Sequence, residues 1–235
     1  MIHLIFEYLA LFAGVQYYRR IQLQTNGQGL LSGQSFWLVL GCIFGAAIGN
    51  KALFWLENPT LFAMNLTTLL HSGQSMVGGL LGGLIGVEVA KRFNGITQRT
   101  GDDFVYPILL GLLIGRIGCF LAGLPDGTHG NPTNLPWGYD FGDGIPRHAT
   151  QLYEIIFTIL LWIGFYLTQQ RLNQVKGLRF RIFLCAYLLW RLLIDSIKPV
   201  PFAYFGVLSG IQLVCVIALL CYLPSTIEAF RKKNL

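Results

Sequence analysis

The stretch FVYPILLGLLIGRIGCFLAGL, residues 104–124, contains one charged side chain, that of Arg116. A helix rises about 1.5 Å per residue, so a segment of this length crosses the roughly 30 Å hydrocarbon core of a bilayer. Six further windows have similar apolar character and length: 2–18, 36–56, 69–90, 151–168, 180–197 and 204–223. The sequence therefore predicts an all-α, polytopic integral membrane protein with about seven transmembrane helices.

The composition supports this prediction. Of the 235 residues, 54% are hydrophobic and 12% are charged, and the mean hydropathy is +0.56. A soluble domain typically carries about a quarter of its residues as charges. No segment outside the windows is large enough for a second domain, so we expect a single membrane domain over residues 1–235. The first window lacks a charged start and a small-residue cleavage site, which favours a retained span over a signal peptide.

The positive charges indicate the orientation in the membrane. With seven spans, twelve of the 17 Lys and Arg residues fall on one side: Arg19, Arg20, Lys91, Arg92, Arg99, Arg171, Lys176, Arg179, Arg181, Arg231, Lys232 and Lys233. Loops rich in Lys and Arg are typical of the cytoplasmic side, so we predict an outside N-terminus and a cytoplasmic C-terminus. This placement explains the net charge of +6 without a nucleic-acid partner.

Two connecting segments are longer than a simple turn, and both fall on the predicted outer side. Residues 57–68 are mildly apolar, and we expect them along the outer interface. Residues 123–149 are rich in Gly, Pro, Asp and Asn, and connections of this length in compact proteins are usually functional or disordered. Because Trp137 and Tyr139 suit an interfacial position, we predict a lid folded on the membrane surface.

The five cysteines, Cys42, Cys119, Cys185, Cys215 and Cys221, all lie in apolar segments without a C-x-x-C spacing. The sequence predicts neither a disulfide framework nor a zinc site from them. We interpret them as small packing residues within the membrane.

Glycines recur at four-residue spacing in several spans: Gly41, Gly45 and Gly49; Gly78, Gly82 and Gly86; Gly79 and Gly83; Gly111 and Gly115. Small residues one helical turn apart allow helix backbones to approach closely in a membrane. This packing interpretation is favoured for most of them. The other interpretation is a cleft for acyl chains along a stripe without side chains, and the sequence does not separate the two.

Two arginines lie within predicted spans, Arg116 in the fourth and Arg191 in the sixth. A buried arginine costs at least about 2.5–3.5 kcal/mol on insertion, so it usually has a partner and often a function. An Arg191–Asp195 pair at i,i+4 gives a structural explanation for Arg191 but leaves Arg116 unpaired. Both guanidiniums lie at outer-leaflet depth, where their planar forks match the oxygens of a phosphodiester. Lys51 adds a third positive charge in the outer half of the second span.

The segment Pro146–Glu154 opens the fifth span on the same side. A helix start offers free backbone N–H groups and a positive dipole end, which favour an anion. His148 can accept a proton near neutral pH, and Glu154 sits in the first turns. The alternative makes Glu154 a residue that compensates the helix dipole and His148 an interface residue.

Three motifs together resemble the prolipoprotein diacylglyceryl transferase family. They are Gly115-Arg116-Ile117-Gly118-Cys119-Phe120-Leu121-Ala122-Gly123, Leu135-Pro136-Trp137-Gly138, and His148-Ala149-Thr150-Gln151-Leu152-Tyr153-Glu154. Further matches are Gly78-Gly79-Leu80-Leu81-Gly82-Gly83, Arg191 with Asp195, and Leu208-Ser209-Gly210-Ile211-Gln212-Leu213. The resemblance implies a seven-span bacterial inner-membrane enzyme that moves a diacylglyceryl group from phosphatidylglycerol to the lipobox cysteine of a prolipoprotein, releasing glycerol phosphate.

The chain departs from the family pattern at informative positions. Val77 stands where members commonly have histidine, and Ala47 stands where they often have arginine. Asn is frequent at the positions of Cys119 and Ala122. The phosphate-binding arginines match, whereas the proposed base does not, so lipid handling is better supported than the identity of the acceptor.

We therefore expect Arg116, Arg191, His148 and Glu154 to be catalytic. Of the histidines His3, His71, His129 and His148, the last lies in the best-matching motif. We expect His148, backed by Glu154 or Gln151, to supply the base or to orient the acceptor. The predicted substrate-binding residues are Gly115, Gly118, Gly78, Gly79, Gln151, Tyr153, Asp195 and Lys51. The expected partners are phosphatidylglycerol, membrane lipid and the prolipoprotein signal peptide, and no metal or organic cofactor is implied. Two alternatives stay open: a transferase of the same fold with another acceptor, and a non-catalytic phospholipid binder or transporter.

Overall fold

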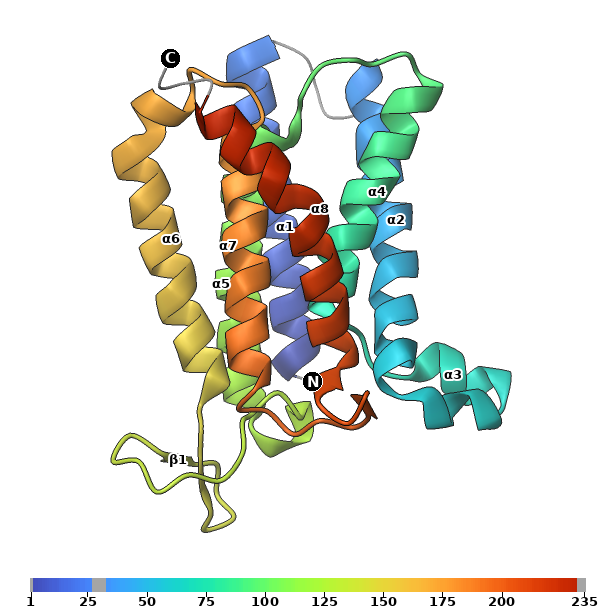
Figure 1. Cartoon of the computed structure of the whole chain (residues 1–235), viewed down its shortest axis with the longest axis vertical. Helices are drawn as coiled ribbons and strands as arrows, with labels where there is room; N and C mark the ends of the chain where they lie inside the picture. Colours follow the sequence, from blue (N-terminus) through green and yellow to red (C-terminus); the bar gives the residue numbers. More distant parts are fainter. Residues whose placement is uncertain (1, 27–32, 232–235) are drawn as a thin grey trace. The chain divides into compact units, whose positions relative to one another are not determined.

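The computed structural model of the chain describes residues 2–26 and 33–231 and is mainly helical (Figure 1). Each of the seven predicted windows overlaps one long helix: α1 (Ile2–Asn26), α2 (Gln34–Glu57), α4 (Met76–Phe93), α5 (Val105–Ala122), α6 (Thr150–Leu172), α7 (Leu178–Asp195) and α8 (Gly210–Arg231). The shorter elements are η1 (Pro59–Ala63), α3 (Leu66–His71), η2 (Gly101–Phe104), η3 (Leu124–Asp126) and the strands β1 (Tyr139–Asp140), β2 (Pro146–Arg147), β3 (Ala203–Tyr204) and β4 (Leu208–Ser209).

Among the residues that the structure describes, four helical segments are long and apolar enough to cross a membrane: Phe36–Glu57, Gly101–Ala122, Thr150–Leu172 and Gly210–Arg231. Large apolar side chains stay exposed on these helices, among them Phe44, Leu160 and Leu220. A helix that exposes such side chains is suited to a lipid environment. The prediction of a helical membrane protein is thus confirmed, whereas seven spans and the orientation stay predictions. Lys232 and Lys233, which contributed to the orientation, lie outside the described residues.

The chain divides into two compact units. The first unit comprises Met1–Thr25, Arg99–Pro199 and Cys221–Leu235, and it includes α1, α5, α6 and α7. The second unit comprises Asn26–Gln98 and Val200–Leu220, and it includes α2, α3 and α4. The single membrane domain stays a prediction.

Within the second unit, α2 and α4 lie side by side along glycines (Figure 1). A methyl group added at Gly82 would overlap the carbonyl oxygen of Gly45, and one added at Gly78 would overlap that of Gly49. Only glycine permits this backbone approach. In lipid the hydrophobic effect does not drive helices together, so close van der Waals packing of this kind stabilises their association. The packing interpretation therefore holds for these glycines.

Alanine substitutions on α4 should separate packing from helix propensity. In G82A, the new methyl group must displace the Gly45 carbonyl, and overpacking of this kind costs about 1–3 kcal/mol. The matched control is G79A, where the nearest heavy atom to the new carbon is the Asn50 Cβ at 3.6 Å. Its stability should stay equal or rise by up to about 1 kcal/mol, because alanine favours the helix. Thermal unfolding in detergent measures both, and equal midpoints would contradict the packing assignment.

The start of the third predicted span differs from the prediction. The window began at residue 69, but α4 begins at Met76 because the Ser75 side chain accepts a hydrogen bond from the Gly78 N–H at 3.4 Å and caps it. A separate short helix, α3, is capped by Asn65, whose side chain accepts from the Thr68 N–H at 2.9 Å. Residues 57–68 are therefore mostly structured as η1 and the start of α3, and their place at the interface stays a prediction.

In the first unit, α5 packs against both α6 and α7 (Figure 1). The Asp102 carboxylate in η2 accepts hydrogen bonds from the N–H groups of Gly177 at 2.5 Å and Phe180 at 2.9 Å, which caps the start of α7. Helix α1 approaches α5 at Gly118, where an added Cβ would overlap the Phe6 side chain. Helices α1, α5, α6 and α7 of this unit therefore surround the region that contains Arg116 and Arg191.

The connection 123–149 is folded. Strands β1 and β2 form an antiparallel hairpin, and the Asp140 carboxylate accepts from the three N–H groups of Gly142, Asp143 and Gly144 in its turn. The Asn131 N–H donates to the Ile197 carbonyl at 2.8 Å, which ties the loop to the segment after α7. The loop thus has fixed structure, and its position as a lid on the membrane surface stays a prediction.

Candidate functional site

The two arginines converge on one carboxylate. Arg116 lies in α5, Glu154 in the second turn of α6 and Arg191 in the last turns of α7. The Glu154 Oε2 atom lies 2.9 Å from a terminal nitrogen of Arg116 and 3.4 Å from one of Arg191. The Tyr187 hydroxyl donates to Oε1 of the same carboxylate at 3.0 Å. All four side chains are at least 95% buried, so this is a dehydrated ionic cluster held by three helices.

Asp195 completes the cluster. Its Oδ1 atom accepts a hydrogen bond from the second terminal nitrogen of Arg191 at 2.8 Å, which is the i,i+4 pair expected from the sequence. The expectation that this pair leaves Arg116 without a partner is wrong, because Glu154 binds Arg116 from a different helix. Two guanidiniums and two carboxylates balance in formal charge, and this balance permits their burial.

A fifth charged group lies close to this cluster. Lys198 follows α7 and is half-buried, with Arg191, Arg116, Glu154 and Asp195 as its charged neighbours. Burial, and then the positive charges of Arg191 and Arg116, lower the pKa of Lys198 to about 7. An amine with that pKa is about half neutral at pH 7, so Lys198 is able to accept a proton near neutrality.

His148 has a different partner from the one expected. Its Nδ1 atom lies 3.3 Å from the Tyr153 hydroxyl, whereas Gln151 donates from Nε2 to the Thr128 hydroxyl at 3.0 Å. Glu154 faces the arginines because successive helical residues point about 100° apart. The predicted support of His148 by Glu154 or Gln151 is therefore wrong, and Tyr153 takes that place.

The two glycines flanking Arg116 have different surroundings. An added Cβ at Gly118 would overlap Phe6, so this residue allows helix packing. An added Cβ at Gly115 would meet no heavy atom within 4 Å, so space stays open beside the Arg116 turn.

Three predicted site residues belong to the second unit. The Lys51 ammonium donates to the carbonyls of Ser72 at 2.5 Å and Gly73 at 3.3 Å, which ties α2 to the segment after α3. Gly78 is packed against Gly49 and Leu53 of α2, and Gly79 has only ordinary contacts. Within this unit, Lys51 thus has a structural role.

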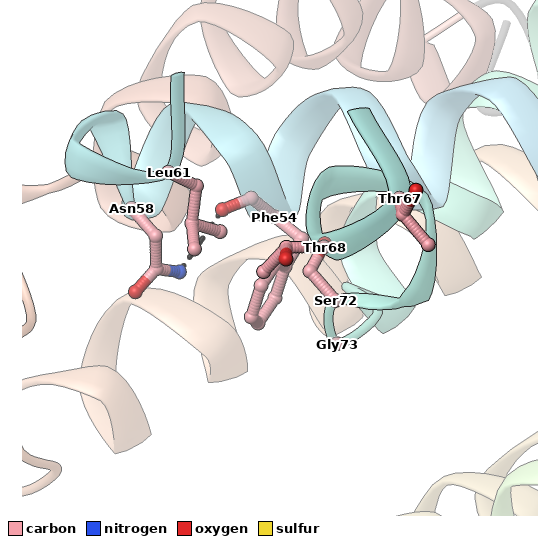
Figure 2. Close-up of a pocket in the computed structure, with 7 residues that line it drawn as sticks. All are labelled: Phe54, Asn58, Leu61, Thr67, Thr68, Ser72 and Gly73. Carbon is pink, nitrogen blue, oxygen red and sulfur yellow. Dashed lines mark hydrogen bonds between the residues drawn. The ribbon is translucent and has the colours of Figure 1, made fainter. Parts of the chain in front are cut away.

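Among the described residues of the second unit, two surface hollows stand out. Figure 2 shows one of about 540 Å³ at the end of α2, lined by Phe54, Asn58, Leu61, Thr67, Thr68, Ser72 and Gly73, none of which is titratable. The other is an apolar groove of about 680 Å³ along α2 and α4. Its floor includes five of the glycines that bring the helices together: Gly41, Gly45, Gly49, Gly82 and Gly86. These glycines thus both allow α2 and α4 to pack closely and line an apolar groove. From the sequence alone, the two roles were alternative interpretations.

Sequence reasoning missed Tyr187 and Lys198. Tyr187 lies four residues before Arg191, so helical periodicity alone places it on the same face of α7. Lys198 lies three residues after Asp195, beyond the end of the helix, where no periodicity applies.

Comparison with known proteins identifies the family of the chain. The family model described as prolipoprotein diacylglyceryl transferase matches residues 4–227. The phosphatidylglycerol–prolipoprotein diacylglyceryl transferase of Nitratidesulfovibrio vulgaris (strain DP4) is 33% identical, over 77% of this chain and 70% of the relative. The protein of that name from Bordetella avium (strain 197N) is 30% identical, over 86% and 79% of the two chains. The resemblance seen in the motifs is confirmed, and the chain belongs to the prolipoprotein diacylglyceryl transferase family.

Proposed function

We propose that this protein transfers the diacylglyceryl group of phosphatidylglycerol to the lipobox cysteine thiol of a prolipoprotein, releasing glycerol phosphate. The observation that carries the proposal is the convergence of Arg116 and Arg191, from two helices, on the Glu154 carboxylate. Family membership gives the reaction class, and the convergence of two guanidiniums supports their assignment as the groups that bind the phosphodiester.

The arginines act as a phosphate clamp. Each guanidinium has five N–H donors, and Arg191 directs one terminal nitrogen to Glu154 and the other to Asp195. Its Nε has no hydrogen-bond partner among residues 2–26 and 33–231. Because Glu154 and Asp195 hold the guanidiniums in place, binding the phosphate requires little reorganisation of either side chain.

In the transfer step, the acceptor sulfur attacks the glyceryl carbon that bears the phosphate. A carbon–sulfur bond forms, the bond from that carbon to the phosphate oxygen breaks, and its electron pair leaves with glycerol phosphate. Negative charge grows on the leaving oxygen, and the buried guanidiniums of Arg116 and Arg191 stabilise it more strongly than water would.

The thiol proton needs an acceptor, because a thiol of pKa about 8.5 is only a few per cent ionised at pH 7. His148 at the start of α6 is one candidate, with Tyr153 fixing its ring. Lys198 is the second, and the observation that favours it is its low pKa beside the clamp.

The pH dependence of kcat/KM distinguishes the two bases. A base with pKa about 7 is active when neutral, so the rate of the wild type should rise from pH 6 to a plateau above about pH 8. K198M should lose this rise if Lys198 is the base, and H148Q should lose it if His148 is. H71Q is the control for histidine loss; the His71 side chain lies outside the described part of the chain. A rise that persists in both K198M and H148Q would exclude both assignments.

The remaining predicted site residues fit this scheme. Gly115 leaves space beside Arg116, and Gly118 lets α1 close on α5. Gln151 and Tyr153 position the loop and His148. Gly78, Gly79 and Lys51 shape the unit whose apolar groove along α2 and α4 suits acyl chains.

We further propose seven spans in the bacterial cytoplasmic membrane, with the arginine clamp in the outer half and the C-terminus in the cytoplasm. A phosphatase reporter should be active when inserted near Asn131 and inactive when fused at Leu235, which lies outside the described residues. The reverse pattern would reject this orientation and the outer-leaflet site with it.

The direct test of function is release of glycerol phosphate by purified protein in phosphatidylglycerol vesicles. Release that requires a lipobox peptide, with the peptide gaining the diacylglyceryl mass, is the expected result. Release without gain of mass by the peptide would indicate another acceptor, and lipid binding without any release would indicate a non-catalytic binder.

A further inference from the structure

Outside the arginine–carboxylate cluster, the first unit gathers three side chains of metal-ligand type. His3 comes from the first turn of α1, Cys119 from α5 and Asp126 from the end of η3. One ligand atom from each lies within 4.8 Å of the others, and the His3 Nε2 atom lies 3.1 Å from the Asp126 Oδ1 atom. Cys119 is buried, while His3 remains partly open to solvent.

We infer that His3, Cys119 and Asp126 form a binding site for one zinc ion. Thiolate, imidazole and carboxylate together suit a borderline-soft divalent ion, and three protein ligands leave a fourth position for water. In a tetrahedral zinc site the ligand atoms are about 3.3 to 3.7 Å apart, so closing this set requires shifts of about 1 Å or less per atom. Binding would displace the Cys119 thiol proton to solvent as the zinc–sulfur bond forms.

The groups around the ligands support this assignment. The His3 Nδ1 atom, opposite the one that faces Asp126, lies 3.7 Å from the Glu7 carboxylate, an arrangement that orients a metal-binding imidazole. The second oxygen of Asp126 accepts a hydrogen bond from the Thr128 hydroxyl. His3 and Asp126 thus each have a polar neighbour outside the ligand set.

The helix packing explains how residues so distant in sequence meet. Gly118 precedes Cys119 and lets the Phe6 turn of α1 approach α5, which brings His3 toward the sulfur. The Arg116 guanidinium also contacts the Cys119 sulfur, at 3.8 Å. A zinc ion at this site would therefore be bound by a sulfur atom that also contacts Arg116 of the proposed phosphate clamp.

The test uses full-length, tag-free protein in detergent, stripped with a chelator and titrated with Zn²⁺ and, separately, Co²⁺. We expect one equivalent of zinc by elemental analysis and a thiolate-to-cobalt charge-transfer band in the near ultraviolet. C119S should lose the band, and H3A and D126N should each weaken zinc binding by at least about 100-fold. E7Q should weaken zinc binding by about 10-fold, because it removes only the carboxylate beside the His3 ring.

The matched control is C185S, because Cys185 lies on α7 and contacts the Thr226 hydroxyl instead of this cluster. Its zinc stoichiometry and cobalt spectrum should equal those of the wild type. Wild-type protein that binds no zinc, or binding that survives in both C119S and H3A, would overturn the inference. Since His3 lies at a partly exposed helix end, H3A keeps the test valid even where C119S fails to fold. Metal binding is measured without turnover, so the result is independent of the proposed reaction.

Discussion

Replacing Arg116 with alanine should lower the rate of glycerol phosphate release by about 10²- to 10³-fold, the loss typical when one stabiliser of transition-state charge is removed. The reason is electrostatic: Arg116 is one of the two guanidiniums that converge on Glu154, and the proposed clamp uses the positive charge of both to stabilise the leaving phosphate. R191A should have an effect of the same size. R116K should recover little activity, because an ammonium keeps the charge but loses the planar fork.

The control for R116A is R171A, which removes an exposed arginine at the end of α6 in the same unit. Its turnover should match that of the wild type. Size-exclusion and thermal unfolding in detergent establish that each variant is folded before its rate is compared. Near-normal turnover in folded R116A would reject the clamp and leave Arg116 a structural role only.

Replacing Glu154 with alanine should destabilise the protein by about 3–5 kcal/mol, the usual cost of leaving a buried charge uncompensated. Here the cost falls mainly on Arg116, whose ion pair is with Glu154, because Arg191 keeps its pair with Asp195. E154Q preserves the shape and one acceptor oxygen for Tyr187, so its loss should be smaller than that of E154A. Chemical or thermal unfolding in detergent measures the series.

The comparison for Glu154 is D143N, which removes the carboxylate of an exposed ion pair with Arg147 at 2.6 Å. Surface pairs contribute little because water and salt screen them, so this variant should unfold near the wild-type midpoint. The contrast tests burial directly, because the pair with the shorter distance should have the smaller effect. If E154A is as stable as D143N, the positive charges of Arg116 and Arg191 are neutralised by groups other than Glu154.

Much of the fold follows from local sequence signals. Charge-poor windows predict the long helices, and the i,i+4 spacing predicts the Arg191–Asp195 pair because both ends lie on one helix. Side-chain caps were harder to predict. Ser75 caps α4 and moves its start to Met76, although the apolar character of the sequence begins earlier.

The residues of the candidate site could be predicted from the sequence, but most of the contacts between their side chains could not. Arg116, Arg191 and Glu154 were each identified, but the contact of Glu154 with both arginines depends on three helices meeting, which no local pattern encodes. The same reason explains the missed approach of His3 to Cys119. The glycine stripe was predicted correctly as a packing seam because its signal, a four-residue period, is local.

The cap that Asp102 places on α7 has a consequence for how the lipid is received. Asp102 ties the start of α7 to η2, which leads directly into α5, and Glu154 ties the same two helices again nearer their other ends. These two connections fix the distance between α5 and α7. The spacing of the two guanidiniums is therefore set before the proposed phospholipid headgroup binds. The two arginine side chains lose their conformational entropy during folding. Binding of a headgroup in each turnover therefore costs little further side-chain entropy.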